Sequence, residues 1–557
     1  MCGIFCSISA DIAVTPDESA LANLKARGPD SLKDHLVVLR TPGNEGSASQ
    51  TTIINFVSTV LALRGNQVQV QPLVDGETGS VLCWNGEAWK FGNHVVSGND
   101  SVRVFKLLLA ASQTLQPRDG VLKALTNIAG PFAFVYYDAV SLTVYYGRDR
   151  LGRRSLMISR DSNSSIVISS NSTNSAYISC SEIDTATIQV LDIANSITIP
   201  ELLPRQDSGP SMNKTLPSTE QILPIPTAEN VNTLQSQLHE ALRLRVTDIP
   251  WLSRRSACAK VAVLFSGGLD CSLLARLAHD ILPIDQPIDL LNIAFENPRS
   301  LRAANLPNSS SLYEICPDRI TGRSSHAELS RSCPERNWQF VAINIPYEES
   351  RHHRSKIVDL MHPHATEMDL SIAMALYFAA RGQGLTSTGT SYKTPARVLL
   401  SGLGADELFA GYTRHATAFS RTGFPGLVDE LELDFTRIGS RNLGRDDRIM
   451  SYWGREVRYP YLDETFAAFT LQLPVWEKCG FRSKRSSADL GDQCSTNAMR
   501  TQDLEPAKLA LRMLACKLNL PSVAAEKKRA IQFGARTAKM EVHSPGKGRR
   551  KGTDVVA

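Results

Sequence analysis

Cys2 is the first residue whose type and position could do chemistry. If the initiator methionine is removed, Cys2 carries both a thiol and a free α-amine. The amine titrates near about 8 and can take the thiol proton without a histidine partner, so one residue supplies a nucleophile and its base. A cysteine also reaches position 2 by chance, and this residue alone does not establish an activity.

A second stretch, residues 261–272, reads VAVLFSGGLDCS and suits phosphate binding. Residues 261–265 form a continuous apolar run, which predicts a strand buried on both faces. Residues 269–280 have the apolar spacing of a helix. The glycines between them let an anion approach backbone N–H groups and the positive end of the helix dipole. An SGG sequence without such a strand and helix is usually only a turn.

A third stretch, residues 397–412, reads RVLLSGLGADELFAGY. An apolar strand ends at a glycine turn, and Asp406 and Glu407 then open a helix. Carboxylates beside a phosphate-facing turn suit Mg²⁺, which takes oxygen ligands and bridges phosphate oxygens. The alternative is an ordinary helix start, where acidic residues interact favourably with the helix dipole.

Composition restricts the class of protein. A chain of 557 residues exceeds one core, so we expect two domains joined by a linker. On a chain of this length, a net charge of +4 is too small to indicate electrostatic attraction to nucleic acid or to a membrane surface. The cysteines number 11 and form no C-x-x-C pair, which argues against a disulfide framework and favours a reducing compartment. With no signal peptide and no apolar run of membrane length, we expect a cytoplasmic protein.

Short motifs follow Cys2 in order along the first part of the chain. They are RGPD (27–30), LR (63–64), QP (71–72), WNGE (84–87), GND (98–100), YYD (136–138) and RD (148–149). This series resembles the class II glutamine amidotransferases, which are N-terminal-nucleophile hydrolases. The resemblance implies an αββα sandwich. Apolar segments that agree with its strands lie at 53–63, 81–84, 132–137, 142–146 and 166–169.

The same resemblance implies a role for each matching residue in glutamine hydrolysis. Cys2 would attack the side-chain amide of glutamine. Asn85 and the Gly86 N–H group would form the oxyanion hole, which needs fixed donors where negative charge develops.

Three charged residues would bind the glutamine backbone groups by this resemblance. Arg64 would pair with the α-carboxylate, which a guanidinium fork fits well. Glu87 and Asp100 would receive the α-ammonium group. Singly, each residue is more often a surface charge or part of a turn, but the ordered set favours the functional interpretation.

The SGGLD turn resembles the pyrophosphate loop of the ATP pyrophosphatase class. It lacks the lysine and spacing of the two commoner phosphate loops. By this resemblance, serines and backbone amides hold the β,γ-pyrophosphate of ATP, and the aspartate carries magnesium. The positions that would contact ATP are Leu264, Ser266, Gly267, Gly268, Asp270, Ser272 and Ile293, the last against adenine. Cys271 stands where the class has serine.

The third stretch resembles the asparagine synthetases, which have LSG-x-G-[SA]-DE-x-F-x-GY at this point. Ser401 and Gly402 would touch the nucleotide, and Asp406 would share the magnesium ion with the aspartate of the SGGLD turn. Lys528 is a candidate for neutralising the charge of the departing pyrophosphate. The alternative for Lys528 is a solvated basic cluster over residues 527–529.

Position 403 departs from the asparagine synthetase pattern. Those enzymes have glutamate there, assigned to the attack of ammonia on the adenylated substrate, and this chain has Leu403. Leucine can neither take a proton nor hold a charge. The departure puts amide formation in doubt more than ATP binding.

We therefore expect two functional domains in one chain. Residues 2–200 would form the amidotransferase domain, 201–230 a linker, 231–540 a parallel-sheet α/β domain of ATP pyrophosphatase type, and 541–557 a basic disordered tail. Residues 296–337 and 483–502 resemble insertions. We expect residues 382–395 to form a flexible break. The tail also allows a nuclear signal or an RNA contact.

The favoured hypothesis is an ATP- and Mg²⁺-dependent amidotransferase of asparagine-synthetase type. It would convert glutamine, aspartate and ATP into asparagine, glutamate, AMP and pyrophosphate. Its partners would be these small molecules, with no membrane or nucleic acid; the sequence does not indicate an oligomeric state. A catalytically incomplete scaffold or sensor that binds glutamine or ATP is the alternative. Nucleobase chemistry on RNA is a third, although no C-x-x-C motif or extended basic patch supports it.

Overall fold

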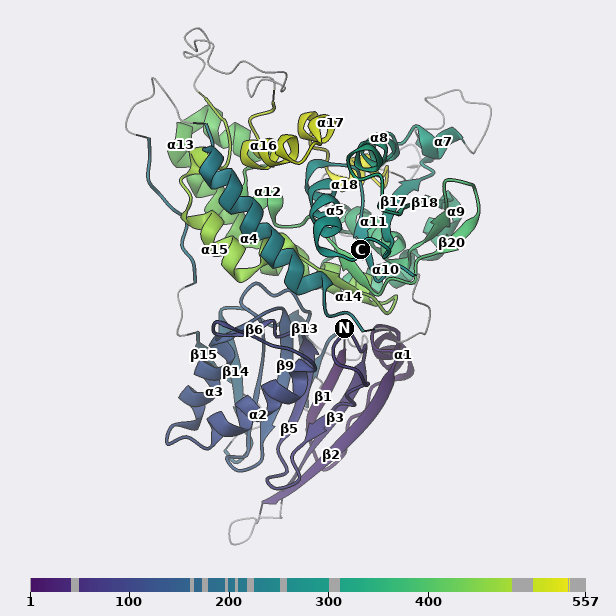
Figure 1. The fold of residues 1–557 in the computed structure, drawn as a ribbon. Coiled ribbons are helices and arrows are strands. Elements are labelled where there is room, and N and C mark those ends of the chain that lie inside the picture. The colour runs from purple at the N-terminus through teal and green to yellow at the C-terminus, as the bar shows by residue number, and fades with distance from the viewer. Residues whose placement is uncertain are drawn as a thin grey trace, which may run out of the picture.

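The protein has two domains, one above the other in Figure 1. The computed structural model describes residues 2–41, 50–160, 165–172, 179–195, 199–205, 209–217, 225–250, 258–299, 311–482, 504–538 and 540. The expected insertion at 483–502 and the basic tail lie outside these residues. In the described part of the chain, no helix has the length and apolar character needed to cross a membrane.

The first domain contains two six-stranded antiparallel sheets. The first sheet, in spatial order, has β13 (Ser179–Glu182), β11 (Met157–Arg160), β12 (Ile166–Ser169), β1 (Gly3–Ala10), β3 (Gln50–Val60) and β2 (Ser31–Thr41). The second has β15 (Glu201–Pro204), β14 (Thr187–Asp192), β10 (Thr143–Arg148), β9 (Phe132–Asp138), β5 (Val81–Gly86) and β4 (Leu73–Val74). Because β15 pairs with β14, the second sheet extends four residues into the segment that we expected to be a linker.

Alternating side chains hold the two sheets face to face. On β1, Ile4, Cys6 and Ile8 enter the core between the sheets, whereas Phe5 packs under a helix on the opposite face. That helix is α1 (Glu18–Arg27); α2 (Asp100–Ser112) and α3 (Pro117–Thr126) cover the outer face of the second sheet. The predicted αββα sandwich is confirmed.

The second domain is built on a mixed seven-stranded sheet. Its order is β20 (Ser391–Lys393), β19 (Gln383–Leu385), β18 (Trp338–Ile345), β17 (Ile288–Phe295), β16 (Val261–Leu264), β21 (Val398–Leu400) and β22 (Glu456–Arg458). The last five strands are parallel, as predicted. The hairpin of β19 and β20 corrects our expectation of a flexible break at 382–395, because its backbone pairs continue the sheet edge.

Helices cover both faces of this sheet, which explains the continuous apolar strands. One face carries α4 (Ala228–Val246), α5 (Leu269–Ile281), α13 (Thr413–Thr436), α15 (Glu464–Gln472), α16 (Leu509–Lys517) and α17 (Pro521–Ala525). The other carries α10 (Arg354–Met361), α11 (Glu367–Arg381) and α14 (Gly444–Ser451). In Figure 1, α14 lies at the boundary with the first domain.

Short elements complete the fold. They are β6 (Lys90–Phe91), β7 (His94–Val95), β8 (Ile128–Ala129), α7 (Ser311–Glu314), α9 (Tyr347–His352), α12 (Ala405–Leu408), η1 (Gly439–Leu443), η2 (Pro460–Leu462), η3 (Val475–Glu477) and α18 (Ile531–Gly534).

Helix α8 (Pro317–Ser332) corrects a second expectation. We expected residues 296–337 to be an insertion, but α8 packs against the SGG turn. Its Ser325 hydroxyl donates to the Gly267 carbonyl at 2.6 Å. The helix is therefore part of the domain that supports the nucleotide turn.

Candidate active sites

The two sheets of the first domain bring Cys2 and Asn85 together. Cys2 precedes β1 and is buried, and its backbone N–H donates to Asn85 Oδ1 on β5 at 2.9 Å. The other end of the same amide, Asn85 Nδ2, is buried and has no hydrogen-bond partner among the residues described. A free N–H donor beside a thiol suits an oxygen that becomes negative during attack on an amide.

The environment of the thiol keeps it protonated. Burial raises the pKa of Cys2 above its usual range, and the positive chain terminus nearby lowers it. Gln71 Nε2 lies 3.9 Å from Cys2 Sγ. Gln71 belongs to the QP motif of the sequence, for which no role was predicted. The thiol therefore needs a base, and the terminal amine is the candidate expected from the sequence.

A small cavity of about 30 Å³ opens beside Cys2. Its lining contains five of the six residues predicted for glutamine hydrolysis, and the sixth, Asn85, is reached through its bond to Cys2. The lining residues are Cys2, Val60, Leu61, Ala62, Leu63, Arg64, Gln69, Gln71, Trp84, Gly86, Glu87, Asn99, Asp100, Ser101 and Glu456.

Backbone groups fix two of the three charged residues predicted to bind the α-carboxylate and α-ammonium groups of glutamine. The Arg64 guanidinium donates to the carbonyls of Gly98, at 3.1 Å, and of Val96. Asp100 opens α2 and accepts the Ala88 N–H at 2.8 Å. Burial raises the pKa of Asp100, whereas Arg64 lowers it. To bind the α-carboxylate of glutamine as predicted, the Arg64 guanidinium would have to release these backbone carbonyls and donate to the ligand instead.

Glu87 is already paired across the domain boundary. Its Oε1 accepts from Arg458 on β22 of the second domain. Burial raises the pKa of Glu87 to about 8, in spite of the opposing effect of Arg458. Its predicted role with the glutamine ammonium stays a prediction, and sequence reasoning missed Arg458.

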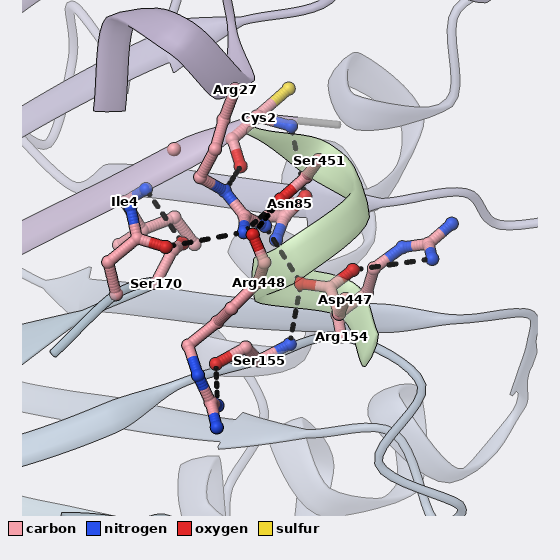
Figure 2. A network of polar contacts seen from close by, with 12 residues as sticks. Cys2, Ile4, Arg27, Asn85, Arg154, Ser155, Ser170, Asp447, Arg448 and Ser451 are labelled. Carbon is pink, nitrogen blue, oxygen red and sulfur yellow. Dashed lines mark hydrogen bonds and ion pairs between the residues drawn. The ribbon is translucent and has the colours of Figure 1, made fainter. Parts of the chain in front are cut away.

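A buried network joins Cys2 to helix α14 of the second domain, as Figure 2 shows. Arg27 Nε donates to the Cys2 carbonyl at 3.3 Å, and its terminal nitrogens reach Ser451 Oγ at 2.6 Å and Asp447 Oδ2 at 2.9 Å. Arg154 also lies against Asp447, at 3.7 Å. The second domain therefore contacts the nucleophile's own backbone through one guanidinium.

The SGG turn of the second domain requires glycine at its centre. Gly267 has φ of +81°, and a Cβ there would lie 2.5 Å from Gly322 Cα on α8. The turn leads into α5, whose Ser272 hydroxyl is buried and has no hydrogen-bond partner in the described structure. The first N–H groups of a helix have no partner within the helix, and with the unpartnered Ser272 hydroxyl they fit a phosphate group.

A cavity of about 180 Å³ lies at the carboxyl ends of the parallel strands. It contains seven of the predicted nucleotide residues, whereas Gly267, Ser272, Asp406 and Lys528 lie beside rather than in the lining. The lining residues are Leu264, Phe265, Ser266, Gly268, Asp270, Cys271, Leu291, Ile293, Asp318, Leu376, Ala379, Ser401, Gly402, Arg529 and Ile531. Ligands of open parallel sheets bind at this edge.

Two lysines connect the carboxylates predicted to hold magnesium. Lys508 Nζ lies 2.6 Å from Asp270 and 2.7 Å from Asp406, and Lys528 Nζ lies 2.7 Å from Asp406. Burial raises the pKa of Asp270, whereas Asp406 has a pKa below its usual range because both lysines outweigh its burial.

The donor set fits Mg²⁺ bound together with a phosphate ligand. Asp270 Oδ1 is buried without a hydrogen-bond partner among the described residues. Over the same part of the chain, no group of three or more His, Cys, Asp or Glu side chains could hold a metal alone. Mg²⁺ commonly takes one or two carboxylates and completes its shell with water and phosphate oxygens.

Lys508 is a residue that sequence reasoning missed. It precedes α16 with φ of +59°, a conformation that costs about 1–3 kcal/mol for a residue with a side chain. A side chain at Gly411 would overlap Lys508 and Asp406, so glycine leaves room for the pair. The only signal in the sequence is a lysine directly before an amphipathic helix.

Asp318 is a second residue that sequence reasoning misses, because its helix α8 lies in the segment that resembles an insertion. The side chain lines the nucleotide cavity and is 7% exposed. Burial raises the pKa of Asp318 to about 7, and Arg529 opposes the shift. A carboxyl group that titrates near neutrality therefore faces the nucleotide site.

Leu403 brings no charge to the place where asparagine synthetases have glutamate. Its side chain packs against the apolar cluster under α11, and its N–H donates to Ser401 Oγ at 3.3 Å. The site has neither an acid nor a base at this position.

Comparison with known proteins agrees with the two-domain architecture. A glutamine amidotransferase domain model matches residues 59–174, and an asparagine synthase model matches 389–429 and 425–541. Asparagine synthetase domain-containing protein 1 of Bos taurus is 32% identical, with 97% of this chain and 96% of that protein covered. The Homo sapiens protein of that name is 31% identical over the same shares, 97% and 96%. Asparagine synthetase domain-containing protein YML096W of Saccharomyces cerevisiae is 32% identical, covering 90% of this chain and 86% of its own. This chain belongs to the family of asparagine synthetase domain-containing proteins, with a glutamine amidotransferase domain and an asparagine synthase domain.

Proposed function

We propose that the first domain hydrolyses glutamine. Cys2 Sγ attacks the side-chain amide carbon, and the α-amine of Cys2 takes the thiol proton. Asn85 Nδ2 donates to the oxygen that becomes negative in the tetrahedral adduct. The adduct releases ammonia and leaves a thioester, which water hydrolyses to glutamate. The bond from Cys2 N–H to Asn85 Oδ1, with Nδ2 left free, supports this assignment.

We further propose that the second domain activates a carboxylic acid with ATP. The acid's carboxylate attacks the α-phosphorus, forms an acyl-adenylate and releases pyrophosphate; ammonia from the first domain then displaces AMP and gives an amide. Lys508 and Lys528 neutralise charge that develops on the pyrophosphate. Mg²⁺, held by Asp270 and Asp406, would neutralise phosphate oxygens.

The observation that carries the proposal is the cluster of two carboxylates and two lysines beside the SGG turn. Their Nζ–carboxylate distances are 2.6–2.7 Å, so the four side chains form one cluster, and Asp270 of this cluster lines the cavity. Alternating opposite charges there suit a polyphosphate and its cation, which an apolar cavity alone would not bind.

Exchange of labelled pyrophosphate into ATP tests the activation step. We expect exchange to depend on one acid of a panel that includes aspartate, to be lost in Asp270→Asn and to persist in Cys2→Ala. Persistence in Cys2→Ala would show that exchange does not depend on the nucleophile of the other site. Exchange that no acid stimulates, with ATP still bound, would overturn the synthetase half.

The packing of Leu403 in the apolar cluster favours a second candidate, a scaffold or sensor that binds glutamine and ATP without forming an amide. Transfer of ¹⁵N from the amide of glutamine to the acceptor acid separates the two. Labelled product supports the enzyme. Glutamine hydrolysis and ATP binding without any labelled product would support the scaffold. In the enzyme hypothesis, aspartate is the specific acceptor acid. Leu403 weakens this choice of acceptor, because asparagine synthetases have glutamate at that position.

A further inference from the structure

The cavity beside Cys2 is not formed by the first domain alone. One of its lining residues, Glu456, comes from β22, the edge strand of the second domain's sheet. Glu456 is 2% exposed, so its carboxylate is enclosed between the domains rather than presented to solvent. Because residues of both domains line this pocket, it is complete only when the two domains are in contact.

Two arginines fix the carboxylate of Glu456 at this position. Arg458 Nε donates to Glu456 Oε1 at 2.7 Å, and Arg154 of the first domain lies 3.2 Å from Oε2. The same Arg458 guanidinium also donates to Glu87. One cation therefore holds a carboxyl group from each domain, and both carboxyl groups line the same cavity.

The charged lining of this cavity is predominantly acidic. Glu87, Asp100 and Glu456 face it, and Arg64 is the cation among its described lining residues. Arg64 gives its N–H groups to backbone carbonyls. Arg154 and Arg458, which pair with Glu456 and Glu87, are not among the described lining residues. Carboxyl groups therefore line the cavity on this side, where they can accept charge-assisted hydrogen bonds from a positive group of a ligand.

We propose that Glu456, a residue of the second domain, forms the α-ammonium subsite of the first domain's glutamine site together with Glu87. This rests on the proposed glutamine hydrolysis and deepens it, because it makes the second domain a determinant of substrate specificity in the first. Arg154 and Arg458 are positioning residues that hold the pair in place. The inference predicts that selection for the α-amino group depends on a residue that is 369 positions away from Glu87.

Binding of two ligands tests the subsite directly. Glutaramate has the amide and the carboxylate of glutamine but no α-ammonium group. We would measure both ligands by calorimetry on the full chain carrying Cys2→Ala, which prevents turnover. Adding Glu456→Gln should weaken glutamine about tenfold, as expected for one charge-assisted hydrogen bond, and change glutaramate less than about twofold.

Glu182→Gln is a matched control. Glu182 is also an interface glutamate held by two arginines, Arg448 at 2.6 Å and Arg148 at 3.4 Å, but it is not part of the cavity lining. We expect it to leave the ratio of glutamine to glutaramate affinity unchanged. Glu456→Asp, which keeps the charge on a shorter side chain, should weaken glutamine less than Glu456→Gln and guards against misfolding of that variant.

The outcomes separate failure of this inference from failure of the proposed function. If Glu456→Gln weakens both ligands equally, or neither, the inference is wrong while glutamine binding stands. If the Cys2→Ala chain binds no glutamine at all, the proposed glutaminase fails and the subsite fails with it. Loss confined to glutamine supports the subsite.

Discussion

The two candidate sites differ in what holds them together. The glutamine site spans the domain boundary: its nucleophile is tied to α14 through Arg27, and its lining includes Glu456. The nucleotide cavity is lined by residues of one domain at the carboxyl edge of its own sheet. The first site therefore depends on domain docking, whereas the second depends on the topology of a single sheet.

Their charges are balanced in different ways as well. At the domain boundary, guanidinium groups pair with carboxylates in fixed positions, as with Arg27 and Asp447, both fully buried. At the nucleotide cavity, lysines pair with the carboxylates, and flexible ammonium groups can move to phosphate oxygens when a ligand arrives. The arginine–carboxylate pairs therefore fix the positions of the two domains, whereas the lysines of the nucleotide cavity can leave their carboxylates and bind phosphate.

Replacing the nucleophile gives the largest expected effect and tests whether the sites are separate. Cys2→Ala should lower glutamine hydrolysis by about 10⁴-fold or more, because no other group forms the thioester. ATP binding, measured by calorimetry, should stay within about twofold, since no described residue of the first domain lines the nucleotide cavity. Weakened ATP binding would show that the two sites are coupled more closely than their separate linings indicate.

Asp447→Asn should break the first site without touching the second. Asp447 is fully buried and holds both Arg27 and Arg154, and removing one partner of a buried ion pair typically costs about 3–5 kcal/mol. We expect lower resistance to urea and slower glutamine hydrolysis, with ATP affinity retained in the protein that remains folded.

Glu432→Gln is the control for Asp447→Asn. It removes an exposed pair with Lys214, which should change stability by less than about 1 kcal/mol. Equal destabilisation by the two substitutions would contradict the special role of the buried network at the boundary.

Local patterns predicted the buried strands, whereas the αββα layers of the first domain were implied by its resemblance to class II glutamine amidotransferases. The apolar run VAVLF before SGG indicated a doubly covered strand, and β16 is that strand. The residues around Cys2 were found because Asn85 and Arg64 stand in short ordered motifs. Where chemistry depends on a residue and its nearest neighbours in the chain, the sequence carries the signal.

Contacts between distant segments were missed. Lys508 joins Asp270 and Asp406 only because α16 packs beside α5, and a lone lysine before a helix does not indicate this. Glu456 and Arg458 occupy a three-residue edge strand that has no special spacing. Their role follows from domain docking, which periodicity does not encode.

Lys508→Met tests the nucleotide cavity alone. The side chain approaches two carboxylates at 2.6 and 2.7 Å, and loss of one preorganised charge usually lowers a rate by about 10²–10³-fold. We expect that loss in ATP–pyrophosphate exchange and no loss in glutamine hydrolysis. Lys527→Met is the control, because Lys527 is 79% exposed and lies near Glu505 rather than the carboxylate pair.

The smallest expected effect concerns how pH acts on the nucleotide cavity. Burial raises the pKa of Asp318 to about 7, so the group is neutral below that pH and negative above it. A negative Asp318 opposes a polyanionic ligand, so ATP affinity should fall as pH rises from about 6 to about 8, by at most about tenfold.

Asp318→Asn should remove this part of the pH dependence. Comparing the variant with the native chain at each pH by calorimetry cancels protonation of the nucleotide itself. The glutamine site should respond in the same way in both chains, because Asp318 is not among its lining residues. If the ratio of ATP affinities stays constant across this range, Asp318 does not sense the nucleotide. The charge that ATP meets in the cavity would then be set by Asp270, Arg529 and the cluster of Lys508, Asp406 and Lys528.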